Sequence, residues 1–461
     1  MTAATPSAQW SSRLGFILAS AGSAIGLGAM WKFPYWAGEN GGAAFIIPFI
    51  LFTFTTGVVL VIAELALGRA GRGSVVEAMR RAGGRSFMWL GGLAVLTAFL
   101  ILSYYAVVGG WCTAYLVEAA TGQAVSADPE ELKIHFGELV RSGGRNIAWL
   151  MVFLAAVCGT ALCGVQRGIE RLSKILMPGF FLLMVGLAAS SLMLPGAWDG
   201  VEYLFKFSWE DVTPEVILNA MGFTFFSLSL GAGILVTYGA YVKKETPLPA
   251  ASMWVGVLSV QAALLAGLVI MPAVFAYGLE PNAGPGLVFI TLPLIFSQIP
   301  AGGLFAVLFY LCLLVAALTS AVSLLEVAVA FLVHEFGFSR RSAVLLYFAG
   351  LFILSCVSAL SFGPWSGFRI FDRIIFDFLD YICTNFLMTL NGFAVAILMG
   401  WKAWPRMVNE LSRPDEAGRT TSKTTLAAIG VGLKWLAPLM VLAACWEGVW
   451  GLLQSALAAL F

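Results

Sequence analysis

The sequence predicts an all-α membrane protein that crosses the bilayer eleven times. Its 461 residues are 60% hydrophobic and only 11% charged, with a mean hydropathy of +0.91, whereas soluble proteins have about 25% charged residues. Long apolar runs recur along the whole chain, and Lys and Arg gather in alternate connections between them. A chain this apolar cannot cover itself with polar surface in water, but lipid as solvent removes that requirement.

Eleven apolar runs reach the roughly 20 residues that a spanning helix needs. They are 13–37, 41–68, 88–120, 147–165, 170–194, 214–241, 249–277, 303–334, 342–362, 372–401 and 432–460. The first run has no small-residue cleavage site and leads directly into the second, so we expect a retained helix and not a signal peptide. The longest polar connection, about 121–146, is too short for a large aqueous domain.

The charges of the connections predict the orientation. One set of connections is basic: Arg69, Arg72, Arg80, Arg81, Arg85, Arg167, Arg171, Lys174, Lys243, Lys244, Arg340, Arg341, Lys402, Arg406, Arg413, Arg419 and Lys423. The alternate set is mostly acidic: Asp128, Glu130, Glu131, Glu138, Asp199, Glu202, Glu210, Asp211 and Glu215. Because basic connections stay in the cytoplasm, we expect a multi-pass inner-membrane protein with a cytoplasmic N-terminus and a periplasmic C-terminus.

Several function classes are disfavoured. The net charge of +1 provides no field for nucleic acid. The seven cysteines lie in apolar runs without a CxxC pair, and His135 and His334 are isolated, so neither disulfides nor a metal centre of the His/Cys type is expected. The chain also has no G-x-S-x-G or H-E-x-x-H motif, and we expect no enzyme.

Glycine clusters interrupt two of the apolar runs. The first contains GSAIGLGAM over 22–30, and the sixth contains FSLSLGAG over 226–233. Each Gly costs about 1 kcal/mol relative to Ala inside a helix, so such clusters favour unwinding. Close helix packing through small residues would explain either cluster alone. Unwound backbone at membrane depth is tolerated around a cavity, where it offers carbonyls to cations and helix N-termini to carboxylates.

The positions of the two clusters indicate an internal repeat. They fall in runs one and six, the spacing of two five-helix repeats, of which the second is inverted because five is odd. We therefore divide the single transmembrane domain into a first repeat over 13–194, a second inverted repeat over 214–401 and an additional helix over 432–460.

Motifs along nearly the whole chain resemble those of the neurotransmitter:sodium symporters. They include RLGFILA at 13–19, WKFPY at 31–35, ENGGAAF at 39–45, ELALGR at 64–69, YY at 104–105, GIERLSK at 168–174, FSLSLG at 226–231, YGAY at 238–241, FITLP at 289–293 and LTS at 318–320. The resemblance implies the LeuT fold, alternating access and sodium-coupled amino-acid transport. With eleven runs, the chain resembles the shorter bacterial members.

The resemblance also implies a central amino-acid site between spans 1, 3, 6 and 8. Its residues would be Ala24, Leu27, Gly28, Ile101, Tyr105, Phe226, Ser227, Ser229, Ala232, Ser320 and Leu324. Carbonyls around Ala24, Phe226 and Ser229 would hold the ammonium group. The backbone near Leu27 and Gly28 and the Tyr105 hydroxyl would hold the carboxylate.

The expected pocket wall carries no charge, so a charged substrate side chain would lie there unpaired at high cost. Ala232 stands where relatives often carry a bulky residue, which enlarges one end, while Ile101 narrows another. We expect leucine, isoleucine, valine or methionine as substrate, with aromatic amino acids such as tryptophan as the alternative.

The resemblance places gates on both sides of this site. Phe226 and Tyr105 would form a lid, and Lys32 with Asp380 would form the outer gate pair. On the inner side Trp10 and Tyr241 are kept, but Ser7 and His334 stand where the family has an Arg–Asp pair. The usual inner salt bridge is therefore not expected.

One sodium ion per substrate is expected, without chloride. The family's second sodium site would use carbonyls of Gly22, Ile25 and Ala316 and hydroxyls of Thr319 and Ser320. At the first site, Ala29 replaces an Asn and Ser259 a stronger ligand, although Ser227 remains; persistence of that site through water is the alternative. Around the chloride position stand Phe49, Phe223, Ser227 and Ala263, which offer an anion little.

Two further function classes compete with a carrier. A channel predicts a polar stripe through the bundle, and an amino-acid sensor on a carrier fold predicts an added cytoplasmic domain; the sequence shows neither feature. As partners we expect the small-molecule substrate and the lipid bilayer, with the chain a monomer or weak homodimer.

Overall fold

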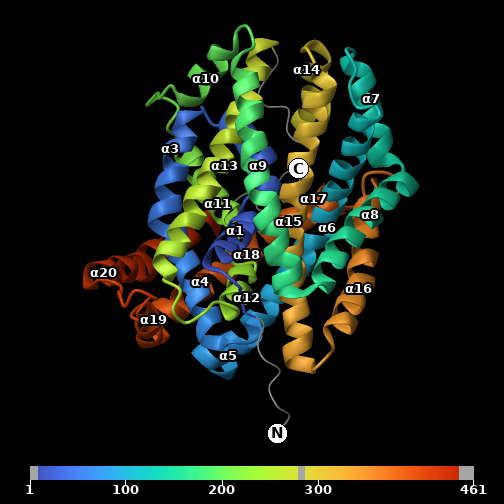
Figure 1. The fold of residues 1–461 in the computed structure, drawn as a ribbon. Helices are drawn as coiled ribbons and strands as arrows, with labels where there is room; N and C mark the ends of the chain where they lie inside the picture. Colours follow the sequence, from blue (N-terminus) through green and yellow to red (C-terminus); the bar gives the residue numbers. More distant parts are fainter. Residues whose placement is uncertain (1–8, 279–285, 446–461) are drawn as a thin grey trace.

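The computed structural model describes residues 9–278 and 286–445. It is a bundle of long helices, with shorter helices at its two ends (Figure 1). Helices α7, α10 and α14 lie at the upper end in that view, and α5 and α19 lie at the lower end. A two-stranded antiparallel hairpin, β1 (Arg369–Ile370) with β2 (Arg373–Ile374), precedes α17.

The helices follow the predicted apolar runs, and several contain short π-helical turns, labelled η. The first half consists of α1 (Arg13–Ala24), η1 (Gly28–Lys32), α2 (Phe33–Glu39), α3 (Ala43–Phe52), η2 (Thr53–Gly57), α4 (Val58–Gly71), α5 (Val75–Gly83), the 3₁₀ turn η3 (Arg85–Phe87), α6 (Met88–Ala120), α7 (Pro129–Arg141), α8 (Gly143–Leu162), η4 (Val165–Glu170) and α9 (Arg171–Leu192). The second half consists of α10 (Ala197–Phe205), α11 (Pro214–Ser227), α12 (Ile234–Ala240), α13 (Leu248–Ala276), η5 (Leu287–Thr291), α14 (Leu292–Gln298), α15 (Gly302–Phe336), α16 (Arg340–Leu360), α17 (Ile375–Ile382), η6 (Cys383–Leu387), α18 (Met388–Ile397), η7 (Leu398–Lys402), α19 (Trp404–Leu411), α20 (Lys423–Val431) and η8 (Gly432–Leu436).

Nine helices in the described part are long and apolar enough to cross a membrane. The first predicted run is a tenth, made of two pieces, 13–24 and 28–39, that meet at a bend of 51°. The remaining run, 214–241, is divided into α11 and α12, each too short to span alone. The last span begins at Lys423, earlier than the predicted 432, and its predicted part beyond 445 lies outside the described residues.

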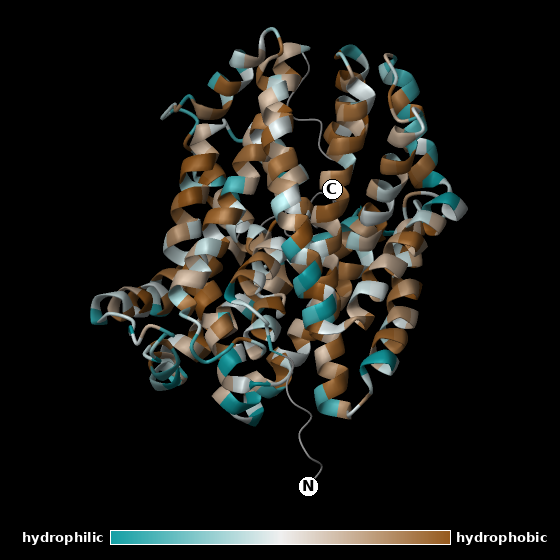
Figure 2. Cartoon of the chain, viewed as in Figure 1, coloured by the Kyte–Doolittle hydropathy of each residue, from teal (hydrophilic) through white to brown (hydrophobic). Residues whose placement is uncertain are grey.

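The distribution of apolar side chains fits a lipid environment. Hydrophobic residues cover the middle of the bundle on its outside as well as its inside, and hydrophilic residues concentrate toward the two ends (Figure 2). Leu182 and Ile353, for example, are 75% and 66% exposed on the outer surface of the bundle. Because lipid tails are as apolar as these side chains, such exposure costs little in a bilayer.

A buried ion pair fixes the lower end. Arg69, at the end of α4, donates from Nε to Glu410 Oε2 at 2.8 Å and from Nη2 to the Glu410 carbonyl at 2.6 Å. Its Nη1 donates to the Thr246 carbonyl at 2.7 Å. Both charged side chains are at most 8% exposed. A buried pair is tolerated where further hydrogen bonds complete it, so α19 is held firmly against α4.

The polar segment between α6 and α8 forms a helix, α7, that the hydropathy pattern did not predict. Phe136 on α7 stacks on Phe289 of η5, with ring centroids 5.2 Å apart and an interplanar angle of 5°. Tyr115 of α6 donates to the Phe289 carbonyl at 3.0 Å. These contacts join α6, α7 and the η5–α14 segment into one cap at the upper end (Figure 1).

A charged cluster attaches α7 to the end of α6. The buried Glu118 carboxylate lies 2.8 Å from His135 Nε2 and 2.6 Å from Arg145 Nη2. The hydrogen bond with Glu118 is the main reason that the pKa of His135 is raised above its usual value; burial and the Arg145 charge oppose this shift, and the Glu138 charge supports it.

The cap is therefore predicted to lose stability as pH rises. A His whose pKa is higher in the folded state contributes its full stabilisation below its unfolded pKa of about 6.5 and loses it as pH rises through the folded pKa. Between pH 6 and pH 8 the thermal midpoint of the detergent-solubilised protein should fall more for wild type than for His135→Gln. Lys133→Gln, on the exposed face of α7, serves as control. Parallel pH profiles for wild type and His135→Gln would contradict the assignment.

Candidate functional site

Both predicted helix breaks lie in the middle of the bundle. The first helix ends at Ala24 and resumes as a π turn at Gly28. The second break separates α11 from α12, and Ser229, Gly231 and Gly233 within it have φ angles of 53°, 76° and 75°. Such positive φ values favour Gly, which explains why the glycine cluster stands here.

Side chains and hydrogen bonds fix the breaks in position. Tyr105 OH accepts from the Leu27 N–H at 2.9 Å, and Ser229 Oγ donates to the Ser23 carbonyl at 3.0 Å. The fully buried Glu64 accepts from the Gly231 N–H through Oε1 at 2.7 Å. Each bond uses a backbone group that the interrupted helix leaves without its usual partner.

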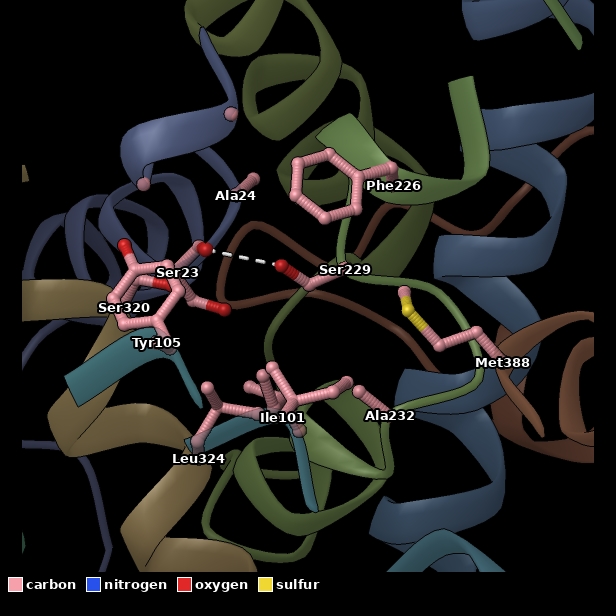
Figure 3. A pocket seen from close by; sticks show the side chains of 13 residues that line it. Ser23, Ala24, Ile101, Tyr105, Phe226, Ser229, Ala232, Ser320, Leu324 and Met388 are labelled. Atoms are coloured by element: carbon pink, nitrogen blue, oxygen red, sulfur yellow. Dashed lines mark hydrogen bonds between the residues drawn. The ribbon is translucent and has the colours of Figure 1, made fainter. Parts of the chain in front are cut away.

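A pocket lies between the two breaks (Figure 3). Its empty volume of about 420 Å³ includes space that is open to solvent. It is lined by Ser23, Ala24, Gly26, Gly28, Ile101, Tyr105, Phe226, Ser229, Ala232, Ile234, Ser320, Leu324 and Met388. None of these thirteen described residues is charged. The polar oxygens come from the breaks, Tyr105 and Ser320, and the rest of the wall is apolar.

The structure brings most of the predicted substrate residues together here. Nine of them line the pocket: Ala24, Gly28, Ile101, Tyr105, Phe226, Ser229, Ala232, Ser320 and Leu324. Leu27 lines the adjoining cavity, and its N–H donates to the Tyr105 hydroxyl. Ser227 lies outside the pocket lining, with its carbonyl accepting from Ser259 Oγ at 3.2 Å.

A second cavity lies on the other side of Phe226 and Tyr105. Both residues line it together with Leu27, Gly28, Trp31, Lys32, Tyr104, Val108, Phe376 and Asp380. Lys32 Nζ lies 3.1 Å from Asp380 Oδ2 and 4.2 Å from the centroid of the Phe226 ring. A Cβ at Gly28 would collide with that ring. The absence of a side chain at Gly28 therefore lets Phe226 lie between the two cavities.

The residues predicted to bind sodium meet where the first break contacts α15. Thr319 Oγ1 lies 3.1 Å from the carbonyl oxygens of both Gly22 and Ala316. Ser320 follows Thr319 and lines the pocket, and Ile25 follows the end of α1 with its N–H donating to the Ala21 carbonyl. Neutral oxygens converging at a break suit a hard cation, so these residues fit a sodium ion.

The position of the family's other sodium site offers fewer oxygens. Ala29 is fully buried and has no side-chain oxygen. Ser259 donates to the Ser227 carbonyl, and Ser227 Oγ lies 3.4 Å from the Thr224 carbonyl. The hydroxyls of Ser227 and Ser259 are therefore both bonded to backbone carbonyls.

The matching chloride position is filled by aromatic rings. Phe49 and Phe223 pack edge to face with centroids 5.1 Å apart, and Phe33 lies 5.7 Å from Phe49. Ala263 belongs to the same buried hydrophobic cluster. These rings and the Ala263 methyl offer an anion neither a hydrogen-bond donor nor a positive charge, so burying an anion among them would be costly.

A network closes the lower end; the sequence analysis named Trp10 and Tyr241 for this side but missed Glu326 and Arg340. Trp10 is buried against Tyr238 and donates from Nε1 to the Tyr238 carbonyl at 3.1 Å. Tyr241 OH donates to the fully buried Glu326 at 2.9 Å, and Arg340 donates to both Glu326 oxygens at 3.1 and 2.5 Å. An ion pair therefore exists at this end, between α15 and α16. His334 is exposed, and Ser7 lies outside the described residues.

One kind of signal in the sequence could have identified two of the missed residues. Glu64 and Glu326 are carboxylates inside apolar runs, and ionisable residues at such positions are usually functional. Glu64 entered the sequence analysis only as part of a motif. Met388, Ile234, Ser23 and Gly26 carry no such signal, because they are ordinary residues of an apolar helix or of the glycine-rich breaks.

Comparisons with known proteins agree with this architecture. The chain matches the sequence model of the sodium:neurotransmitter symporter family over residues 7–127 and 129–429. The chain belongs to this family. It is 38% identical over 415 residues to the sodium-dependent transporter YhdH of Bacillus subtilis, covering 89% of this chain and 92% of that protein. It is also 26% identical over 462 residues to the human sodium- and chloride-dependent creatine transporter 1, covering 87% and 71%.

A solved relative shares the whole fold. The crystal structure of MhsT in complex with L-phenylalanine superimposes with a TM-score of 0.88 and 38% identity, covering 96% of this chain and 99% of MhsT. The predicted fold class is therefore right: this symporter is an all-α membrane protein with the LeuT fold. As a member of this family it is a sodium-dependent transporter, and the family is not a class of enzymes.

The lower network gives a stability prediction for the symporter. Arg340→Met should leave the Glu326 carboxylate buried without its ionic partner. Breaking a buried pair costs about 3–5 kcal/mol, and we expect the low end because the Arg340 side chain is 28% exposed. A lowered thermal midpoint of the purified protein would report the loss. Arg341→Met, at the exposed neighbouring position, should leave the midpoint unchanged. Equal midpoints for both variants would show that the pair is not important for stability.

Proposed function

We propose that this symporter carries a hydrophobic amino acid, together with one sodium ion and independently of chloride, by alternating access. The observation that carries the proposal is the uncharged pocket between the two helix breaks. An amino acid with an apolar side chain needs polar partners only for its ammonium and carboxylate groups. The breaks provide carbonyls for the ammonium and N–H groups for the carboxylate. The remaining wall is apolar, which disfavours a charged side chain.

The main-chain groups of the substrate have defined positions in this proposal. The ammonium group lies near the carbonyls around Ala24, Phe226 and Ser229. The carboxylate lies near the N–H groups of Leu27 and Gly28 and takes the Tyr105 hydroxyl as donor. In the structure that hydroxyl accepts from the Leu27 N–H at 2.9 Å, and its own proton can be donated to an anion.

The side chain of the substrate faces Ile101, Ala232 and Leu324. Leucine, isoleucine, valine and methionine fit this wall by polarity, and aromatic amino acids are the second candidate. The latter gains support from MhsT, which is 38% identical and binds L-phenylalanine in its crystal structure.

Sodium binds at the second site of the family. Thr319 Oγ1 already lies 3.1 Å from the Gly22 carbonyl oxygen and 3.1 Å from the Ala316 carbonyl oxygen. The ion joins the first break to α15, which also contributes Ser320 to the substrate pocket. Binding of ion and substrate is therefore coupled through the same backbone segment.

We also propose how the chain lies in the membrane. The lower end carries the basic segments α5 and α19, so by the positive-inside rule it faces the cytoplasm and the upper end faces the periplasm of a bacterial inner membrane. Lys32, Asp380 and the Phe226–Tyr105 lid then close the outer path, while Trp10 and Tyr241 close the inner path. Counterflow of labelled amino acid in proteoliposomes separates this carrier from a sensor, which exchanges nothing.

The first functional prediction concerns the carboxylate. Tyr105→Phe should weaken substrate binding by about 1.5–3 kcal/mol, the value of a hydrogen bond to a charged group. Binding of labelled leucine to purified protein in sodium measures this loss. Tyr347→Phe, a buried tyrosine on α16 that does not line the pocket, is the matched control. Unchanged affinity in Tyr105→Phe would remove its hydroxyl from the site.

The second functional prediction concerns ion stoichiometry. Uptake should depend on sodium with a Hill coefficient near one, because the other family site has lost oxygen ligands at Ala29. Thr319→Ala or Ser320→Ala should abolish coupling, whereas Ala29→Asn alone should change little. Thr113→Ala, which removes a hydroxyl bonded within its own helix, is the control. A measured ratio of two sodium ions per substrate would refute the single-site proposal, and a chloride requirement would refute chloride independence.

A further inference from the structure

We propose that Met388, facing Ala232 across the end of the pocket, determines which amino-acid side chains the symporter accepts. This inference rests on the proposed function and deepens it. Among the described residues that line the pocket, Met388 alone comes from α18; the others belong to α1, η1, α6, α11, α12, α15 and the two breaks. Figure 3 shows its thioether directed into the pocket at the end where Ala232 also lies. Met388 is only 3% exposed.

A π-helical turn gives Met388 this direction. The turn η6 ends at Leu387, and the Met388 N–H donates to the Cys383 carbonyl five residues back. One extra residue in a turn rotates the following helix by about 100°, because an α-helix has 3.6 residues per turn. The rotation therefore decides which residue of α18 faces the pocket.

The second helix break fixes α18 at the pocket wall. A Cβ at Gly231 would collide with the carbonyl oxygen of Met388, so the two backbones are in close contact. Ala232 is the next residue, and its small side chain leaves the space that the Met388 side chain approaches. The backbone position of Met388 is thus constrained, while its side chain remains the variable part of the wall.

The chemistry of methionine indicates the class of substrate. Its unbranched side chain has three rotatable bonds and a polarizable sulfur, so it adapts to irregular shapes and makes favourable contacts with aromatic rings. A pocket that closes on Met388 is therefore adjustable in length. We infer that it accepts large neutral side chains, from leucine and methionine to phenylalanine, and that it holds alanine and glycine poorly.

The experiment measures rank order and not only affinity. Purified full-length protein in sodium is titrated with alanine, valine, leucine, methionine, phenylalanine and tryptophan in competition with labelled leucine. Met388→Ala should improve binding of tryptophan relative to valine by about tenfold or more. Met388→Phe should weaken binding of phenylalanine and tryptophan relative to valine by about the same factor. One extra or missing methylene in an apolar pocket is already worth about 10–200-fold. Met388→Leu, a swap that cores tolerate, tests the same point if the other variants fail to fold; it should weaken aromatic substrates relative to leucine.

Two controls separate the inference from general effects. Met399→Ala removes an equally buried methionine, 1% exposed, from the same span but outside the pocket lining; it should leave the rank order unchanged. Ala232→Phe should penalise large substrates, and adding Met388→Ala should partly restore them because both side chains occupy one space. A uniform change for all substrates in the Met388 variants would overturn the inference while leaving the proposed function intact. Failure of wild type to bind any hydrophobic amino acid would overturn both.

Discussion

Backbone amides and carbonyls in the middle of a membrane need partners, because no water is present to take their place. Two helices of this symporter are interrupted at that depth, and the surrounding helices provide what the interruptions require. Glu64 accepts from Gly231, Tyr105 from Leu27, and Ser229 donates to Ser23. The positions of α4 and α6 follow from this requirement, and the pocket lies between the two interruptions.

The same constraint explains why cation and substrate sites are neighbours. Carbonyls freed at the first break face Thr319, and the next residue of α15, Ser320, lines the substrate pocket. A ligand at either site therefore orders the same few residues. Such shared ordering is sufficient for two sites to influence each other without any long-range pathway.

Sequence patterns predicted the fold well because the strongest signals were local. Apolar runs marked the spans, and glycine clusters at 22–30 and 226–233 contained both breaks. The pairing of Glu326 with Arg340 was not predicted, since it depends on how α15 and α16 turn against each other. Met388 was missed for a different reason: hydropathy does not reveal a π turn, and without that turn the direction of an apolar residue on a long helix cannot be assigned. Helix α7 was missed because it is amphipathic and not a long apolar run, and because its packing depends on long-range contacts with α6 and η5.

The Arg69–Glu410 pair has a mechanical consequence. Because three hydrogen bonds from one buried guanidinium hold the Glu410 side chain, the Glu410 backbone and the Thr246 carbonyl, α19 cannot tilt independently of α4. Asn409, the exposed neighbour of Glu410 on α19, therefore moves together with α4. A fluorophore or spin label at this exposed position is thus a reporter of the motion of a buried helix.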